Sequence, residues 1–117
     1  MLILTVLKSS VGGRVIISLE KLDRLVGQAK SIVFESSNPD RMSLWRAYVA
    51  LEYAILDLKL RHGLEGNPPP KPVKSADLAA AKSMIGKLDL SSGDNKKLLY
   101  DLRSCRNVIK ALVASKL

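Results

Sequence analysis

The stretch that decides the fold class is LWRAYVALEYAILDL, residues 44–58. Its large apolar residues recur at alternating steps of four and three, which is the spacing of one face of an α-helix; they are Leu44, Tyr48, Leu51, Ile55 and Leu58. Upstream, Asn38 is a suitable N-cap and Pro39 suits the first helical position, while Gly63 is a stop signal. The sequence therefore predicts a helix that runs to His62.

Three further helices are predicted around this one. A helix over 18–36, with Ser18 as its N-cap, carries an apolar stripe at helical spacing, and so does a shorter helix that begins at Ser75. After a turn at 89–94, a last helix extends to the C-terminus. Prolines make residues 64–74 a stiff extended connector. These elements predict an all-α fold, an up-and-down four-helix bundle over residues 18–117.

Residues 1–17 differ from the rest of the chain. Two apolar runs, one of which contains Leu4 and Val6, are separated by a Ser- and Gly-rich breaker, which is typical of a β-hairpin. Two strands are not stable alone in water, so this segment must pack on the bundle or against another copy. We predict an N-terminal arm that forms a dimer contact, either as a hairpin or, as alternatives, as an irregular segment or a short helix.

The composition indicates an intracellular protein with a basic surface. Cys105 is the single cysteine, so no internal disulfide forms, and no apolar run approaches the ~20 residues that span a bilayer. We therefore expect a cytoplasmic location without a membrane role. The net charge of +8 favours polyanions such as nucleic acid. The single glutamine and cysteine are also typical of thermophilic proteins, whose surfaces carry many solvated cations.

The most informative polar residues lie on the last predicted helix. Arg103, Arg106, Asn107 and Lys110 occupy neighbouring turns, so their side chains reach a common patch that could grip phosphate oxygens or a base edge. A solvated basic face near a helix C-terminus explains the cations equally well. Asn107 favours a binding role, because asparagine is a poor helix former. Two connector cations, Lys71 and Lys74, complete the predicted nucleic-acid site.

Other kinds of site lack support in the sequence. No phosphate-binding glycine loop is present, and His62 is the only histidine, so we expect neither a metal site nor a cofactor. His62 suits the last turn of its helix, where a cation complements the macrodipole. Cys105 falls on an apolar seam and is expected to be buried. Trp45 is large enough to be core or an interface anchor, and we predict it at an interface.

Two segments resemble the HEPN superfamily of small helical bundles. Residues 45–54, where small residues and tyrosines alternate, are similar to the second helix of that family. The Arg106-Asn107 pair is similar to the start of its active-site motif on the last helix. The resemblance implies a homodimer. In the family's ribonucleases a histidine follows the arginine after four to six residues, where this chain has Ala111, Leu112 and Val113.

The missing histidine implies a member that binds without cutting, because proton transfer is worth about 100- to 10,000-fold in rate. The first hypothesis is thus a homodimeric, non-catalytic HEPN-like bundle that binds RNA or a nucleotide through the basic patch. The second is a protein-interaction adaptor or toxin–antitoxin partner with no nucleic-acid role. An enzyme would need Glu52 and Asp57 to be buried and close to Arg106.

Overall fold

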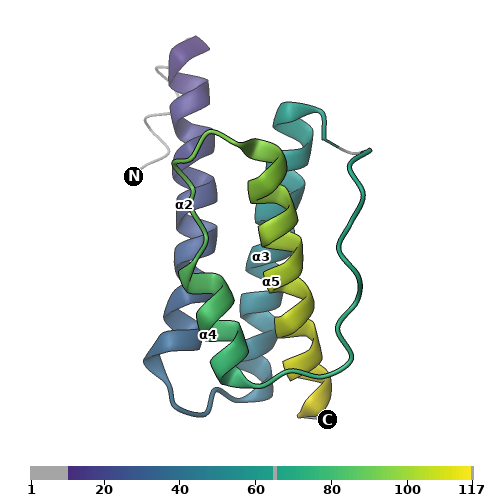
Figure 1. Ribbon diagram of the computed structural model, residues 1–117. Helices are drawn as coiled ribbons and strands as arrows, with labels where there is room; N and C mark the ends of the chain where they lie inside the picture. The colour runs from purple at the N-terminus through teal and green to yellow at the C-terminus, as the bar shows by residue number, and fades with distance from the viewer. Residues whose placement is uncertain (1–10, 65, 117) are drawn as a thin grey trace.

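The computed structural model describes residues 11–64 and 66–116, with side chains described from residue 21 onward. The helices are α2 (Val11–Glu35), α3 (Arg41–His62), α4 (Leu78–Gly86) and α5 (Asn95–Ser115), and the described residues contain no strand. The predicted all-α four-helix bundle is therefore confirmed (Figure 1).

Each helix runs antiparallel to the two helices on which it packs (Figure 1). Helix α2 packs against α3 and α4, and α5 packs against the same two. The connector between α3 and α4 runs back along the outside of the bundle beside α5, so α3 and α4 have the same direction and lie at diagonally opposite corners. This crossover lays the proline-rich segment along the flank of α5. It also interrupts, between α3 and α4, the alternation of direction that the predicted up-and-down order implies.

The core consists of aliphatic side chains from all four helices. On α3 the predicted seam is confirmed, since Leu44, Leu51, Ile55 and Leu58 are buried and Tyr48 is half-buried. The other helices contribute the predicted stripes, which include Leu22, Val26, Ala81, Ile85, Leu102, Cys105 and Ile109. A fully buried Leu or Ile side chain contributes about 1.5–3 kcal/mol. Packing of these stripes therefore dominates the stability of the bundle.

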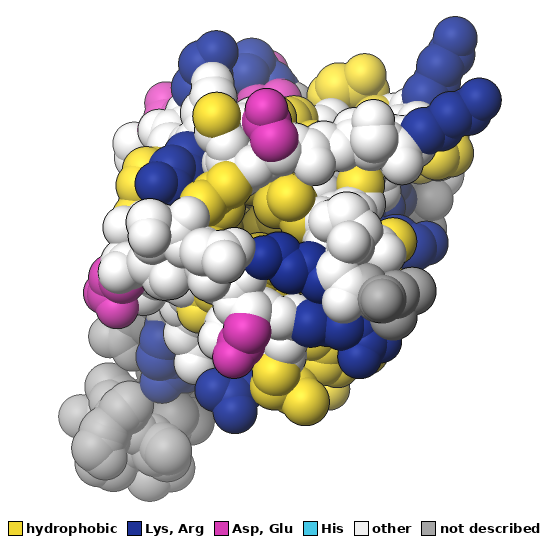
Figure 2. Space-filling view, turned by 90° about the horizontal axis from the view of Figure 1, so that it is seen from below, with side chains coloured by type: hydrophobic (Ala, Val, Ile, Leu, Met, Phe, Trp, Pro, Cys, Tyr) yellow, Lys and Arg dark blue, Asp and Glu magenta, His cyan; other side chains and the backbone are white. Residues whose placement is uncertain are grey.

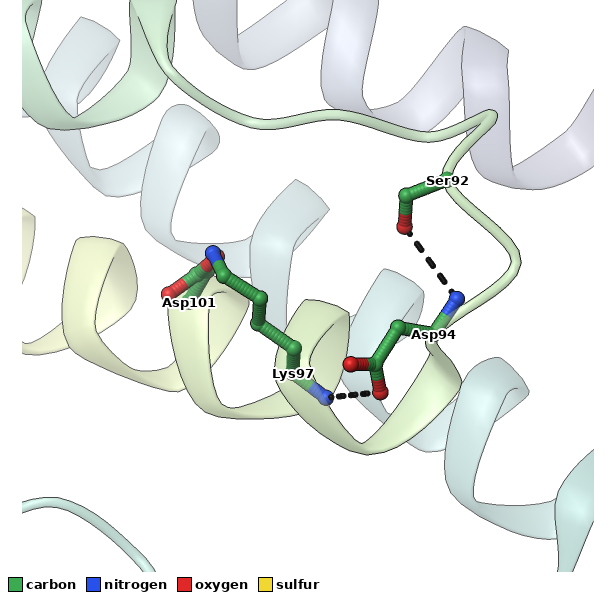
Figure 3. A network of polar contacts seen from close by, with 4 residues as sticks. All are labelled: Ser92, Asp94, Lys97 and Asp101. Carbon is green, nitrogen blue, oxygen red and sulfur yellow. Dashed lines mark hydrogen bonds and ion pairs between the residues drawn. The ribbon is translucent and has the colours of Figure 1, made fainter.

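Three helices begin at aspartates that the sequence analysis did not select. The N-cap of α3 is Asp40 instead of Asn38, because Asp40 accepts a 2.8 Å hydrogen bond from the Ser43 backbone N–H. The N-cap of α4 is Asp77 instead of Ser75. At α5 the cap is Asp94, which accepts from the Lys97 N–H (Figure 3). A carboxylate supplies an acceptor and also complements the positive end of the helix dipole.

The polar contacts that begin α5 extend over its first turns (Figure 3). The Asp94 N–H donates to Ser92 Oγ at 3.2 Å, and Lys97 Nζ lies 2.7 Å from Asp101 Oδ2 one turn further along. The predicted stop of α3 is also confirmed, since Gly63 adopts a left-handed φ of 62° and donates its N–H to the Lys59 carbonyl. These local contacts fix where α5 begins and where α3 ends.

Of the alternatives for the N-terminal segment, the hairpin was wrong for its second strand, where the structure has a helix. Helix α2 begins at Val11, so residues 15–17 are helical and the boundary proposed between 17 and 18 lies inside a helix. A helix satisfies its backbone hydrogen bonds within one segment, whereas an isolated two-stranded hairpin is marginal in water. The first run, with Leu4 and Val6, lies outside the described residues. None of the described helices has the length and apolarity needed to cross a bilayer.

Candidate nucleic-acid interface

The polar residues predicted on the last helix share one flank of α5. Because Leu102, Cys105 and Ile109 take the buried face, the positions between them fall beside α3 and the proline-rich connector. A groove of about 500 Å³ lies there between α3, the connector and α5. Its walls include Tyr48, Glu52, Pro69, Pro70, Pro72, Val73, Lys74, Arg106, Asn107, Lys110 and Ala111. Three predicted α5 residues and one predicted connector lysine therefore line the same groove.

Arg106 is paired within the chain. Its guanidinium forms a 2.7 Å ion pair with Glu52 Oε1 on α3, and its Nε donates to Asn107 Oδ1 at 2.9 Å. Both side chains, which the sequence analysis assigned to contacts with phosphate or a base edge, are thus engaged within the chain. The side chains of Arg106 and Glu52 remain 20% and 39% exposed, so solvent, or a ligand in the groove, reaches the pair.

Glu52 is held on both of its oxygens. The hydroxyl of Tyr48, one turn earlier on α3, donates to Glu52 Oε2 at 2.9 Å. Burial, this hydrogen bond and the charge of Glu52 raise the pKa of Tyr48, against the opposing charge of Arg106. The carboxylate is therefore oriented toward Arg106, and the Tyr48 ring forms part of the groove wall.

The side chains of Asn107 and Arg103 hold the connector in place. Asn107 Nδ2 donates to the Lys71 carbonyl at 3.3 Å, and Arg103 donates from one terminal nitrogen to the Asn67 carbonyl at 2.9 Å. Arg103 is only 7% exposed and does not line the main groove; it lines a neighbouring hollow. Lys71 is exposed, and its described contact with the site is this backbone carbonyl. Arg103 and Lys71 thus support the groove wall.

The condition set for an enzyme is met only in part. Glu52 contacts Arg106 but is not buried, and Asp57 pairs instead with Arg61 at 2.9 Å. Cys105 is fully buried, as expected, and burial raises the pKa of its thiol to about 12. Among the described residues, no three His, Cys, Asp or Glu side chains gather as metal ligands do.

The predicted interface residue Trp45 is 48% exposed and stacks on Tyr48 with their ring centroids 5.1 Å apart. It borders a second, more apolar groove between α2 and α3, of about 770 Å³. The sequence analysis missed that Trp45 belongs to a row of exposed apolar residues on α3. Their spacing by three and four could have revealed this row. It was missed because, in the sequence, the residues of a second apolar face merge with those of the core-facing stripe.

The surface around the candidate site is basic. The groove itself is lined by three cations, Lys74, Arg106 and Lys110, and by one carboxylate, Glu52. On the end of the bundle where α5 finishes, more Lys and Arg side chains are visible than Asp and Glu, with apolar patches between them (Figure 2). Anions are therefore attracted to this side of the molecule.

Neither a family model, nor a curated protein, nor a solved structure matches this chain. Membership of the HEPN superfamily therefore stays a prediction.

Proposed function

We propose that this protein is a non-catalytic, HEPN-like helical bundle that binds RNA or a nucleotide in the groove between α3, the connector and α5. The observation that carries the proposal is convergence. Lys74 comes from the connector, while Arg106 and Lys110 come from α5, and all three line one groove. Cations that converge from separate segments can make several charge-assisted hydrogen bonds to the oxygens of one phosphate.

The shape and chemistry of the groove suit a nucleotide unit. Its volume of about 500 Å³ is within the usual range for small-molecule sites. Lysine ammonium groups at Lys74 and Lys110 offer donors to phosphate oxygens, and both side chains are exposed. The ring of Tyr48 and the connector prolines supply an apolar wall for a base or sugar. Stacking on aromatic rings tolerates any base, so we expect weak sequence preference.

The Glu52–Arg106 pair gives the groove an internal competitor. A phosphate that enters must share Arg106 with the Glu52 carboxylate, which lies 2.7 Å away. Guanidinium has five N–H donors, and those not used by Glu52 and Asn107 are available to a ligand. We therefore expect moderate affinity in the native protein and tighter binding once the carboxylate is neutralised.

The residues after Arg106 support the proposal that the protein binds without cutting. The HEPN resemblance would place the general acid/base at Ala111, Leu112 or Val113, and all three side chains are buried and cannot titrate. The carboxylate in contact with Arg106, Glu52, is already its ion-pair partner. The proposed module is a binding protein of the reducing cytoplasm, where a single buried cysteine is stable.

The proposal is tested with substitutions that leave the fold intact. Lys74→Ala combined with Lys110→Ala removes two exposed groove cations, and we expect roughly tenfold weaker binding of a labelled single-stranded RNA. Lys87→Ala combined with Lys96→Ala is the matched control, because these exposed lysines carry the same charge away from the groove. Measuring the affinity for a mononucleotide as well as for the RNA shows which of the two ligands the groove prefers. Equal losses of RNA affinity in both double variants would mean that only net charge matters, and would contradict binding in the groove.

A second candidate, a protein-interaction adaptor or toxin–antitoxin partner, is favoured by the exposed apolar face of α3. An adaptor that binds no anion would show no RNA affinity even in low salt. Its contact surface would then be α3, and substitutions in the groove would leave binding of the protein partner unchanged.

A further inference from the structure

Helix α3 is apolar on two sides. One side is the buried seam described above, and the other carries large apolar side chains that are 45–63% exposed. This outer stripe comprises Met42, Trp45, Val49, Tyr53, Leu56 and Leu60, with Val49 half-buried among them. Steps of three and four keep the outer stripe on one face along most of the helix, over roughly 27 Å. Soluble monomers rarely expose such a continuous row.

The area of the outer stripe matches the centre of a dimer interface. Aromatic side chains bury roughly 150–250 Å² each, so half-exposed Trp45 and Tyr53 together offer roughly 200 Å². Met42, Leu56 and Leu60 are exposed to a similar degree and extend the patch to several hundred Å². A standard interface needs about 800 Å² from each partner. The adjoining α2–α3 groove, which has Leu25 and Ile32 in its walls, supplies further apolar surface on the same side.

We infer that a second copy of this chain covers the outer stripe, with the two α3 helices packed antiparallel about a two-fold axis level with Leu51. The spacing supports this arrangement. Met42 and Leu60 lie nine residues on either side of Leu51, and Val49 and Tyr53 lie two residues on either side. An antiparallel pair therefore sets Met42 against Leu60 of the other copy and Val49 against Tyr53, while Trp45 comes within one position of Leu56 of the other copy.

Charge complementarity favours the antiparallel direction. Arg46 and Asp57 each follow a stripe residue by one position, so they lie on the same flank of the outer stripe, near opposite ends. An antiparallel two-fold keeps that flank common to both copies and brings Arg46 of each toward Asp57 of the other, whose carboxylate Arg46 would share with Arg61. A parallel two-fold would put the flanks on opposite sides, where neither Arg46 meets an Asp57, so the attraction would be lost. Trp45, held by its stack on Tyr48, is a preorganised anchor for such an interface.

The dimer is independent of ligand binding, so its test needs no RNA. We expect sedimentation equilibrium of the full chain to give twice the 12.8 kDa chain mass. Trp45→Glu combined with Leu56→Glu should raise the dimer Kd roughly thirtyfold or more. Tyr100→Glu is the control, because Tyr100 is 52% exposed but lies on α5. A monomer at all concentrations, or a dimer that tolerates the Trp45 and Leu56 substitutions, would overturn the inference.

Cross-linking tests the direction of the helices and remains informative if a charged variant fails to fold. Proteins with Met42→Cys or Leu60→Cys are mixed and oxidised, with the native Cys105 buried and unreactive. The antiparallel pair predicts a disulfide that joins a Met42→Cys chain to a Leu60→Cys chain in the mixture. It predicts no disulfide-linked dimer when either variant is oxidised by itself. Disulfides formed by Met42→Cys alone would indicate a parallel or unrelated contact and refute the arrangement.

Discussion

At the scale of single residues, the feature that matters most is the ion pair between Glu52 and Arg106. The two residues are 54 positions apart in the chain, and only the packing of α3 against α5 brings them to 2.7 Å. The pair lies in the wall of the candidate groove and ties up the arginine on which the sequence hypothesis rests. Its strength therefore decides how much of Arg106 a phosphate can use.

The substitution Glu52→Gln should strengthen RNA binding. The glutamine side chain has nearly the same shape as glutamate and keeps an acceptor for Tyr48, but its neutral amide would release the Arg106 charge to the ligand. We expect roughly fivefold tighter binding, together with a stability loss of under about 1 kcal/mol, since the pair is partly exposed. Fluorescence anisotropy with labelled RNA measures the first effect and urea unfolding the second.

The matched control for that substitution is Asp57→Asn. It removes the same charge from the same helix, but Asp57 pairs with Arg61 outside the groove. Equal gains in Glu52→Gln and Asp57→Asn would mean that only net charge matters. Unchanged or weaker binding in Glu52→Gln would show that Arg106 does not contact the ligand.

Tyr48 should make stability depend on pH in the alkaline range. Its folded pKa is raised above the ordinary value of 10.0, chiefly by burial and by its hydrogen bond to Glu52. Above pH 10 the unfolded chain releases the phenol proton while the folded chain retains it, so the free energy of unfolding falls until the pH passes the folded pKa. The stabilisation is fully present below the unfolded pKa.

Comparison with Tyr48→Phe isolates this effect. At neutral pH we expect the variant to be about 1 kcal/mol less stable, because it loses the hydrogen bond to Glu52. That difference should shrink as the pH rises above the ordinary tyrosine pKa of about 10, and urea unfolding at several pH values measures it. Tyr100→Phe, at an exposed position on α5, is the control. A constant difference between wild type and Tyr48→Phe across the pH range would contradict the assignment.

At the scale of elements, the sequence predicts what depends on local pattern and misses what depends on packing. The seam of Leu44, Leu51 and Leu58 can be recognised in the sequence because burial of one helix face requires apolar residues at the helical period. Asp40, and not the nearby Asn38, is the N-cap because of one local hydrogen bond. Such a bond depends on backbone geometry and leaves no periodic pattern in the sequence. The pairing of Glu52 with Arg106 also cannot be predicted from the sequence, since it depends on how α3 and α5 are rotated against each other.

The N-terminal error has a related cause. A run of β-branched residues at 15–17 favours a strand by propensity, but α2 includes it. Helical hydrogen bonds need only neighbouring residues, whereas the predicted strand needed a partner strand. Propensity over three residues is a weak signal beside the continuity of a long helix. Short apolar runs are therefore a poor guide to strands in a chain dominated by helices.

The C-terminal stop of α3 gives a prediction at this scale. Gly63→Ala should destabilise the protein by roughly 1–2 kcal/mol, because a Cβ is strained at a φ of 62°. No atom beyond residue 63 and its two chain neighbours would lie within 4 Å of that Cβ, so the cost is conformational. Urea unfolding measures the change.

Gly66→Ala is the control for this substitution. Gly66 also has open space around its Cβ position but does not adopt a positive φ. We expect it to change stability little, or to raise it slightly by restricting the unfolded chain. If both alanine variants behave alike, backbone strain at Gly63 does not explain the helix stop.

At the scale of the whole molecule, the bundle presents two surfaces of different chemistry on either side of α3. The connector and α5 form a groove lined by three cations, while the outer stripe of α3 is apolar. A dimer through the outer stripe leaves the groove of each copy to its own ligand. The net charge of +8 then acts twice in one particle and attracts a polyanion to both grooves.

The most direct test of the central claim is the salt dependence of affinity for single-stranded RNA. If phosphates occupy the groove, a plot of log Kd against log salt concentration should be steep, with about 0.7 added to the slope per phosphate neutralised. The Lys74→Ala, Lys110→Ala double variant should lose roughly 1.4 from that slope, while Lys87→Ala with Lys96→Ala keeps the native value. Affinity that is absent at low salt, or that does not change with salt, would contradict the proposed function.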